Sequence, residues 1–442
     1  MKFKILILFV LLIFSSYPSY AKDKDISEYD YLKFLGESIE KIKSDYVEHI
    51  DNKEIVESAI NGILSSLDPH SSFLNAKSLD DMKIQTKGEF GGLGIEVTME
   101  NGFVKVISPI DNTPADKAGI KAGDYITHLD KKSVIGLSLD EAVNKMRGPV
   151  GSKLQVTIGR VDNEPFDVTI KRDIIKITTV RSRLEKDVGY VRITTFSEQT
   201  NNSTKDAIKK LKKNKNLKGY IVDLRNNPGG LLEQAVAISD LFLEKGEIVS
   251  TRGRDSENPE TYKARPGDII NGLPLVVLIN SGSASASEIV AGALQDHKRA
   301  IILGTQSFGK GSVQTIIPVN PFGALRMTTA RYFTPSGRSI QKKGITPDIT
   351  VEEAKVEKLE TRNGNRESDL KGALDNPNKN EETRNGNRES DLKGALDNPN
   401  KNEENKDVNE TKKNQSVNDF QLSRALDLVR GISLYKNKLA IN

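Results

Sequence analysis

Cysteine is absent from this 442-residue chain, and histidine occurs only four times. Without cysteine the protein can form no disulfide bond and can carry no lipid on an N-terminal cysteine. Net charge is also low, because 65 basic side chains are balanced by 61 acidic ones, which leaves a formal charge of +4. So small an excess gives no reason to propose nucleic acid as a partner. The length allows two or three domains.

A hydrophobic run long enough to cross a membrane is also missing. The apolar run near the N-terminus, Ile5 to Phe14, follows Lys2 and Lys4 and precedes a small-residue segment that ends at Ala21. This pattern predicts a secretory signal peptide over residues 1–21, cleaved after Ala21. The run is shorter than the roughly 20 residues that span a bilayer, so we expect no stable membrane span after cleavage. We therefore expect an exported protein. Lysines at the start of the signal suggest a bacterial cell, and the location is periplasmic where that cell has an outer membrane.

A serine-rich turn follows the apolar run Leu275 to Ile279. Its sequence is Asn280-Ser281-Gly282-Ser283-Ala284-Ser285-Ala286-Ser287-Glu288. The continuous apolar run predicts a strand that is covered on both faces, and the residues from Glu288 to Asp296 have helical spacing. Free N–H groups at the start of a helix can hold an oxyanion that develops beside a serine hydroxyl. The turn is a candidate nucleophile site, although serine before a helix is more often a simple N-cap.

A serine nucleophile needs a base that takes its proton, and histidine is the usual one. The nearest in sequence, His297, lies 12 residues beyond Ser285. In a helix this spacing separates the two residues by roughly 17 Å, which is far outside hydrogen-bond reach. We therefore do not expect a Ser/His pair from this helix.

Lys310 is the alternative base, between Gly309 and Gly311 after the apolar pattern Ala300 to Leu303. A lysine accepts a proton only when it is neutral. Lowering its pKa from about 10.4 to between 7 and 8 costs about 4 kcal/mol, which burial can impose. Gln314 follows four residues later and could orient the amine by a hydrogen bond. Taken alone, a lysine in a glycine turn is usually a solvated charge.

Together these segments resemble the carboxy-terminal processing peptidases, also called tail-specific proteases, which are Ser/Lys enzymes. The resemblance implies that Ser285 is the nucleophile and Lys310 the base, and that no metal or other cofactor is required. Two further family positions match Asp296 and Gln314. Helix geometry places Asp296 about 16 Å from Ser285, so we expect it to support the fold or the lysine loop rather than to transfer protons.

A second match to this family is Asp223-Leu224-Arg225-Asn226-Asn227-Pro228-Gly229-Gly230, which lies between a strand pattern and a helical pattern. By this resemblance the amides of Gly229 and Ala286 form the oxyanion site, with the choice between Gly229 and Gly230 left open. The strand and helix patterns alternate as β-α-β units, which places both turns at the carboxyl edge of one sheet. Taken alone, the segment would be an ordinary turn.

Two other functions are compatible with parts of the sequence. The segment Gly304-x-x-x-x-Gly309-Lys310 is close to a phosphate-binding loop, but Gly311 replaces the serine or threonine that holds magnesium. Residues 312–319 alternate as a strand, whereas a phosphate-binding loop must begin a helix. The other alternative is a catalytically silent scaffold that binds protein tails without cutting them.

Upstream of the peptidase segments, residues 87–172 resemble a PDZ domain of the bacterial protease type. Strands are predicted near 103–107, 124–129 and 153–158, and a helix over 139–146. A PDZ domain binds an extended C-terminal tail as an extra strand and holds its carboxylate in backbone N–H groups. The carboxylate loop would be Gly92, Leu93, Gly94 and Ile95, and the groove would be lined by Leu139, Val143 and Met146. Some of these three side chains are expected to fill the core instead.

The expected fold is a mixed α+β and α/β multidomain chain. Its parts are a signal peptide (1–21), a helical region (22–86), the PDZ domain (87–172), a β-α-β serine peptidase core (173–355), a polar linker (356–416) and a C-terminal helix (417–442). The linker contains an exact tandem duplication, residues 361–382 repeated as 383–404. Its composition predicts disorder. We expect partners to be protein substrates with unstructured C-terminal tails, and an activating adaptor is a further candidate partner. The resemblance implies that the terminal helices either support the core or pair two subunits as a homodimer.

Overall fold

The computed structural model describes residues 26–161, 163–255, 257–354 and 419–439. The predicted signal peptide, and the predicted linker with its duplication, lie outside the described residues. The chain divides into two compact units: residues up to Leu74 together with 316–327, and the remainder. No helix within the described ranges has the length and hydrophobicity to cross a membrane.

The first unit begins with two capped helices. Helix α2, Glu28–Asp45, starts with a capping box between Ser27 and Asp30, and α3, Asn52–Leu67, is capped by Asp51. The short strand β1, Ser72–Asn75, follows them. Periodicity predicted helices over 26–67, and the structure has two there. The apolar residues of α2 are largely exposed, since no residue of this helix is buried.

The chain runs into the PDZ domain through β2, Glu89–Gly92, and out of it through β9, Asp173–Lys176. These two strands pair as an antiparallel ribbon. Helix α4, Ala76–Lys87, precedes the ribbon. Within the segment one sheet has the order β3-β4-β5-β7-β8, with β6 paired to β5. The strands are β3 Ile95–Glu100, β4 Phe103–Pro109, β5 Tyr125–Leu129, β6 Lys132–Ser133, β7 Lys153–Gly159 and β8 Phe166–Lys171, and the helices are α5 Pro114–Lys117 and α6 Leu139–Met146.

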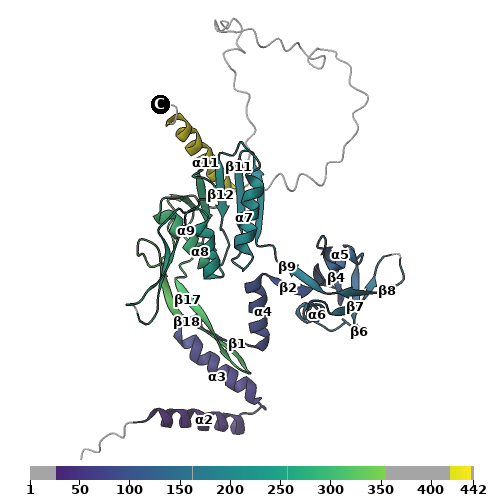
Figure 1. The fold of residues 1–442 in the computed structure, drawn as a ribbon. Helices are drawn as coiled ribbons and strands as arrows, with labels where there is room; N and C mark the ends of the chain where they lie inside the picture. The colour runs from purple at the N-terminus through teal and green to yellow at the C-terminus, as the bar shows by residue number, and fades with distance from the viewer. Residues whose placement is uncertain (1–25, 162, 256, 355–418, 440–442) are drawn as a thin grey trace, which may run out of the picture. The chain divides into compact units, whose positions relative to one another are not determined.

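The core of the second unit is a six-stranded sheet of order β10-β11-β12-β15-β16-β19, in which neighbours from β11 to β19 are parallel. Its strands are β10 Val180–Glu185, β11 Val188–Ile193, β12 Gly219–Asp223, β15 Leu275–Ile279, β16 Ile301–Gly304 and β19 Ile349–Thr350. Helices α7 Thr200–Leu211, α8 Leu232–Asp240 and α9 Ala286–Asp296 pack on one face. Helix α11, Phe420–Leu439, packs on the other (Figure 1).

Strand β15 shows why its sequence is continuously apolar. Val277 and Ile279 pack in the cluster that contains α7, α8 and α9, whereas Val276 and Leu278 pack against α11. Because successive side chains of a strand point to opposite faces, a strand covered on both sides needs an apolar residue at every position. The last helix therefore completes the core even though it lies far along the chain.

A second sheet has the order β1-β18-β13-β14, with β17 paired to β18. Its other strands are β13 Glu247–Arg252, β14 Glu260–Lys263, β17 Ser312–Val319 and β18 Gly323–Phe333. Residues 312–319 thus form the predicted strand, which excludes the phosphate-binding loop because the segment directly after Lys310 is a strand and not a helix. In β18, Tyr332 pairs with Thr251 of β13. This register places the Tyr332 side chain in the main core.

Candidate functional site

The two predicted turns lie together at the carboxyl edge of the parallel sheet. One follows β12 and the other follows β15, and these strands are paired neighbours. The turns are also bonded to each other: the amide of Ala284 donates to the carbonyl of Asn227 at 3.0 Å, and the Ser283 hydroxyl donates to the carbonyl of Leu224 at 2.8 Å. The amide of Asn226 donates to the Asn280 side chain at 2.9 Å. The geometry fits one composite site.

Ser285 stands at the strand-to-helix turn in a sparsely populated backbone conformation. Its φ is 56° and its ψ is −113°, which is unfavourable for a residue with a Cβ. The side chain is buried, with 8% of its surface exposed. Its Oγ lies 2.6 Å from the hydroxyl of Tyr332. Burial raises the pKa of that tyrosine to about 12, so its hydroxyl stays protonated at neutral pH.

The predicted oxyanion donors are neighbours in space. A Cβ built on Gly229, whose φ is 104°, would come within 3.0 Å of the Ala286 amide nitrogen and 2.8 Å of Ser285 Cβ. Only glycine fits at this contact. However, the Gly229 amide already donates to Asn227 Oδ1 at 2.9 Å. The asparagine side chain folds back on the amide two residues later, as asparagine does in turns, so Gly229 is not a vacant donor in this structure.

Glu288 connects the serine turn to the lysine turn. One carboxylate oxygen accepts from the Ser285 amide at 2.8 Å and from the Lys310 amide at 2.9 Å. The other accepts from the Gly309 amide at 2.7 Å and the Ser307 hydroxyl at 2.5 Å. Glu288 has no exposed surface. Four donors satisfy the buried carboxylate, as a buried charge requires.

Glu288 belongs to the serine segment, but no role was predicted for it from the sequence. The available signal was its position three residues after Ser285, which is the spacing of a capping box. That spacing accounts for the bond to the Ser285 amide. It could not reveal the three donors from residues 307–310, which reach Glu288 only through the fold.

Gln314 and Asp296 have different surroundings. The side-chain nitrogen Nε2 of Gln314 donates to the hydroxyls of Ser312 and Thr328, at 3.0 and 3.2 Å. Asp296 forms an ion pair with Arg338 and accepts from the Ser336 amide at 2.9 Å. Burial alone would raise the pKa of Asp296, but hydrogen bonds from Thr334 and Ser336 hold it below its usual value. Asp296 therefore holds the turn that follows β18.

The residues predicted for the PDZ groove lie between the end of β2 and the start of β3, and on helix α6. Strand β3 is at the end of its sheet, so one of its edges is open to an added strand. The half-buried Leu139 and Val143 lie on α6. Leu93 and Met146, by contrast, are 2% and 4% exposed and belong to the domain core. Met146 thus fills the core, as was expected of some of the three predicted groove side chains, whereas a core position had not been predicted for the Leu93 side chain.

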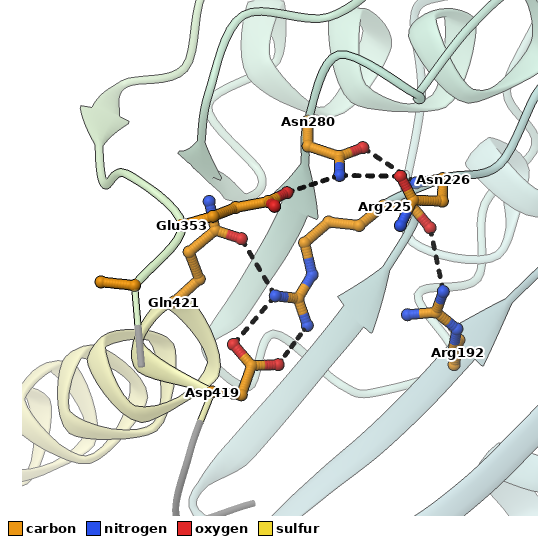
Figure 2. A pocket seen from close by; sticks show the side chains of 8 residues that line it. Arg192, Arg225, Asn226, Asn280, Glu353, Asp419 and Gln421 are labelled. Atoms are coloured by element: carbon orange, nitrogen blue, oxygen red, sulfur yellow. Dashed lines mark hydrogen bonds and ion pairs between the residues drawn. The ribbon is translucent and has the colours of Figure 1, made fainter. Parts of the chain in front are cut away.

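A polar pocket of about 490 Å³ lies at the same sheet edge, beside the turn after β12. Figure 2 shows the residues that line it, and the polar ones are Arg192, Arg225, Asn226, Asn280, Glu353, Asp419 and Gln421. The guanidinium of Arg225 binds both carboxylate oxygens of Asp419, at 2.9 and 2.7 Å, and also binds the buried Asp223. Burial by itself would lower the pKa of Arg225, but these hydrogen bonds raise it. The turn is thus anchored to the start of α11.

The sequence matches Peptidase family S41 over residues 187–351, a PDZ domain over 91–171, and the activating protease CtpB N-terminal domain over 16–78. It is 54% identical over 344 residues to a carboxy-terminal-processing protease of Bartonella bacilliformis, covering 77% of this chain and 79% of that protein. It is 39% identical to the carboxy-terminal processing protease CtpA of Bacillus subtilis, and the match covers 72% of this chain and 68% of that protein.

Among solved structures, the photosystem II D1 C-terminal processing protease matches at 32% identity and a TM-score of 0.43, covering 72% of this chain and 88% of that chain. The family models and the curated relatives confirm the expected multidomain architecture and the resemblance identified from the motifs. The chain belongs to the carboxy-terminal processing proteases of peptidase family S41, and it is a serine-type peptidase that carries a PDZ domain.

Proposed function

We propose that this peptidase is exported, that its PDZ domain captures free C-terminal tails of proteins, and that Ser285 and Lys310 cut the bound chain near its C-terminus through an acyl-enzyme. The observation that carries the proposal is Glu288. A single buried carboxylate holds the backbone amides of both Ser285 and Lys310. It fixes the two turns to each other, as a dyad drawn from separate turns requires.

In the proposed reaction, neutral Lys310 accepts the proton of Ser285 Oγ while the oxygen attacks the peptide carbonyl. The Ala286 amide and a glycine amide of the neighbouring turn hold the oxyanion. For Gly229 to serve as that donor, its bond to Asn227 must be exchanged for one to the substrate; otherwise Gly230 takes the role. Protonated Lys310 then supplies the leaving amine with its proton, and water hydrolyses the acyl-enzyme.

The test uses the full chain, expressed with its first 21 residues and purified after export. The protein is incubated with a folded substrate that ends in an unstructured tail, beside the variants Ser285→Ala and Lys310→Ala. Fragments are identified by mass spectrometry. We expect cuts near the substrate's C-terminus that disappear in both variants. Retained cleavage by Ser285→Ala would refute the assignment of the nucleophile.

Tail recognition is tested separately at α6. Substitutions at Leu93 or Gly94 are poor probes, because Leu93 is a core residue and a Cβ on Gly94 would come within 2.3 Å of Thr113. Val143→Asp instead places a charge on a half-buried position of the expected groove. We expect it to slow cleavage of tailed proteins more than cleavage of a short peptide. Equal effects on both substrates would argue against selective tail binding.

Pairing of two copies is also proposed, through helix α2. Phe34 and Tyr31 on this helix are 68% and 61% exposed, and large apolar side chains three residues apart lie on the same face of a helix, where a partner can cover them. Light scattering should give a dimer mass for the purified protein and a monomer mass for Phe34→Glu. Equal masses would remove α2 from the interface. An activating adaptor would be the remaining explanation if the intact enzyme cleaves nothing.

A further inference from the structure

Tyr332 is a buried side chain of β18 that the proposed reaction does not use. Its hydroxyl lies 2.6 Å from Ser285 Oγ, and only 3% of its surface is exposed. Its own amide donates to the carbonyl of Gly311 at 2.9 Å, which ties β18 to the residue after Lys310. Tyr332 therefore contacts the serine with its side chain and the lysine turn with its backbone.

The direction of the hydrogen bond follows from acidity. A phenol is a stronger acid than an aliphatic alcohol, so in this short pair the Tyr332 hydroxyl is the better donor and Ser285 Oγ the better acceptor. Because burial raises the pKa of Tyr332 to about 12, the phenol keeps the proton that it donates throughout the neutral range. When Tyr332 donates to a lone pair of Ser285 Oγ, the serine's own proton remains available for transfer to the base.

The position of Tyr332 is fixed by its surroundings. The pairing with Thr251 sets the register of the strand, and the ring lies among the apolar side chains of the main core. After the strand, Asp296 binds the turn through Ser336 and Arg338. A donor held in this way needs little reorganisation when charge develops on its partner, and that is the property that makes oxyanion donors effective.

We propose that Tyr332 is a further catalytic residue of this peptidase, a fixed hydrogen-bond donor to Ser285 Oγ. The inference rests on the proposed function, because it takes Ser285 as the nucleophile. During attack the Oγ proton passes to neutral Lys310, the Oγ–C bond forms, and the carbonyl electron pair moves to its oxygen. Tyr332 keeps its proton and stabilises the negative charge on Oγ in this step. The same bond stabilises Oγ again when it leaves the acyl-enzyme.

The test measures the reactivity of the serine with a fluorophosphonate probe, which reports on the nucleophile without a peptide substrate. Tyr332→Phe in the full chain should be labelled about 10–100-fold more slowly, with kcat for peptide cleavage reduced by a similar factor and KM unchanged. Tyr220→Phe is the matched control. Tyr220 is 1% exposed, and its hydroxyl has no hydrogen-bond partner among the residues that the structure describes. It should be labelled at the wild-type rate.

Two noncanonical residues at position 332 separate the loss of a donor from a loss of folding. With 4-aminophenylalanine the ring still carries a donor, and with 4-fluorophenylalanine it has similar size without one. We expect labelling to recover with the first and to stay slow with the second, at equal melting temperatures. Wild-type or faster labelling of Tyr332→Phe would overturn the inference. Labelling of the Ser285→Ala variant at the wild-type rate, at some other residue, would instead overturn the proposed function on which this inference rests.

Discussion

Replacing Glu288 with glutamine tests the central connection of the site. The carboxylate accepts four hydrogen bonds, two on each oxygen. Glutamine keeps one acceptor oxygen, and its NH₂ group would face two donors, so at least two of these bonds are lost. Each hydrogen bond to a charged acceptor contributes about 1.5–3 kcal/mol. Burying a neutral amide rather than a charge offsets part of that loss.

We therefore expect the free energy of unfolding to fall by about 3–5 kcal/mol, which lowers Tm by roughly 6–20 °C for a core of this size. Thermal and urea unfolding of the purified protein measure this change, and peptide cleavage measured well below Tm should be lost as the two turns separate. Glu233→Gln is the control, because it makes the same exchange at an exposed position in the first turn of α8. A Tm within about 2 °C of wild type with normal cleavage would refute the reasoning.

Three further predictions concern the neighbouring elements. Gly229→Ala should cost at least 100-fold in kcat/KM because its Cβ would meet the serine turn; Gly272→Ala, also at positive φ but with open space around it, is its control, and equal losses would contradict the steric argument. Asp419→Asn should destabilise the protein by about 2 kcal/mol at pH 7. Burial tends to raise the pKa of Asp419, but hydrogen bonds from Arg225 lower it, so this contribution is lost as the pH falls through the lowered pKa; a stability gap as large at pH 3 as at pH 7 would refute the prediction. Deleting residues 383–404 should leave cleavage intact and change loop-closure free energy by about 0.4 kcal/mol; lost activity in a folded protein would show that the copy has a role.

Much of this fold could be predicted from local patterns. Strand β15 and helix α6 have the expected boundaries, because an uninterrupted apolar run and a capped amphipathic stretch are encoded within a few residues. The two turns could be placed at one sheet edge because parallel strands joined by helices put their carboxyl ends together. Ser285, Lys310 and the turn at Gly229 were identified by their resemblance to family motifs, and their catalytic roles stay predictions.

The remainder of the site depends on contacts between distant segments. Tyr332 reaches Ser285 through the pairing of β18 with β13, and no periodicity within a strand specifies such a register. The bond between Asn227 and Gly229 was missed for another reason: a turn sequence predicts a turn, but not which amide the side chain occupies. Glu288 combines both cases, with one local bond and three that are not local.

The hydrogen bond between the Phe420 amide and the Ala354 carbonyl, at 3.3 Å, joins the points where the chain leaves and re-enters the described core. Because those points already touch, covalent continuity between them mainly sets the effective concentration at which α11 meets its sheet. Helix α11 is in this sense an intramolecular ligand: its affinity comes from Leu422, Ala425 and Val429 against the sheet and from Asp419 on Arg225. A separate peptide carrying α11 would be held by the same contacts.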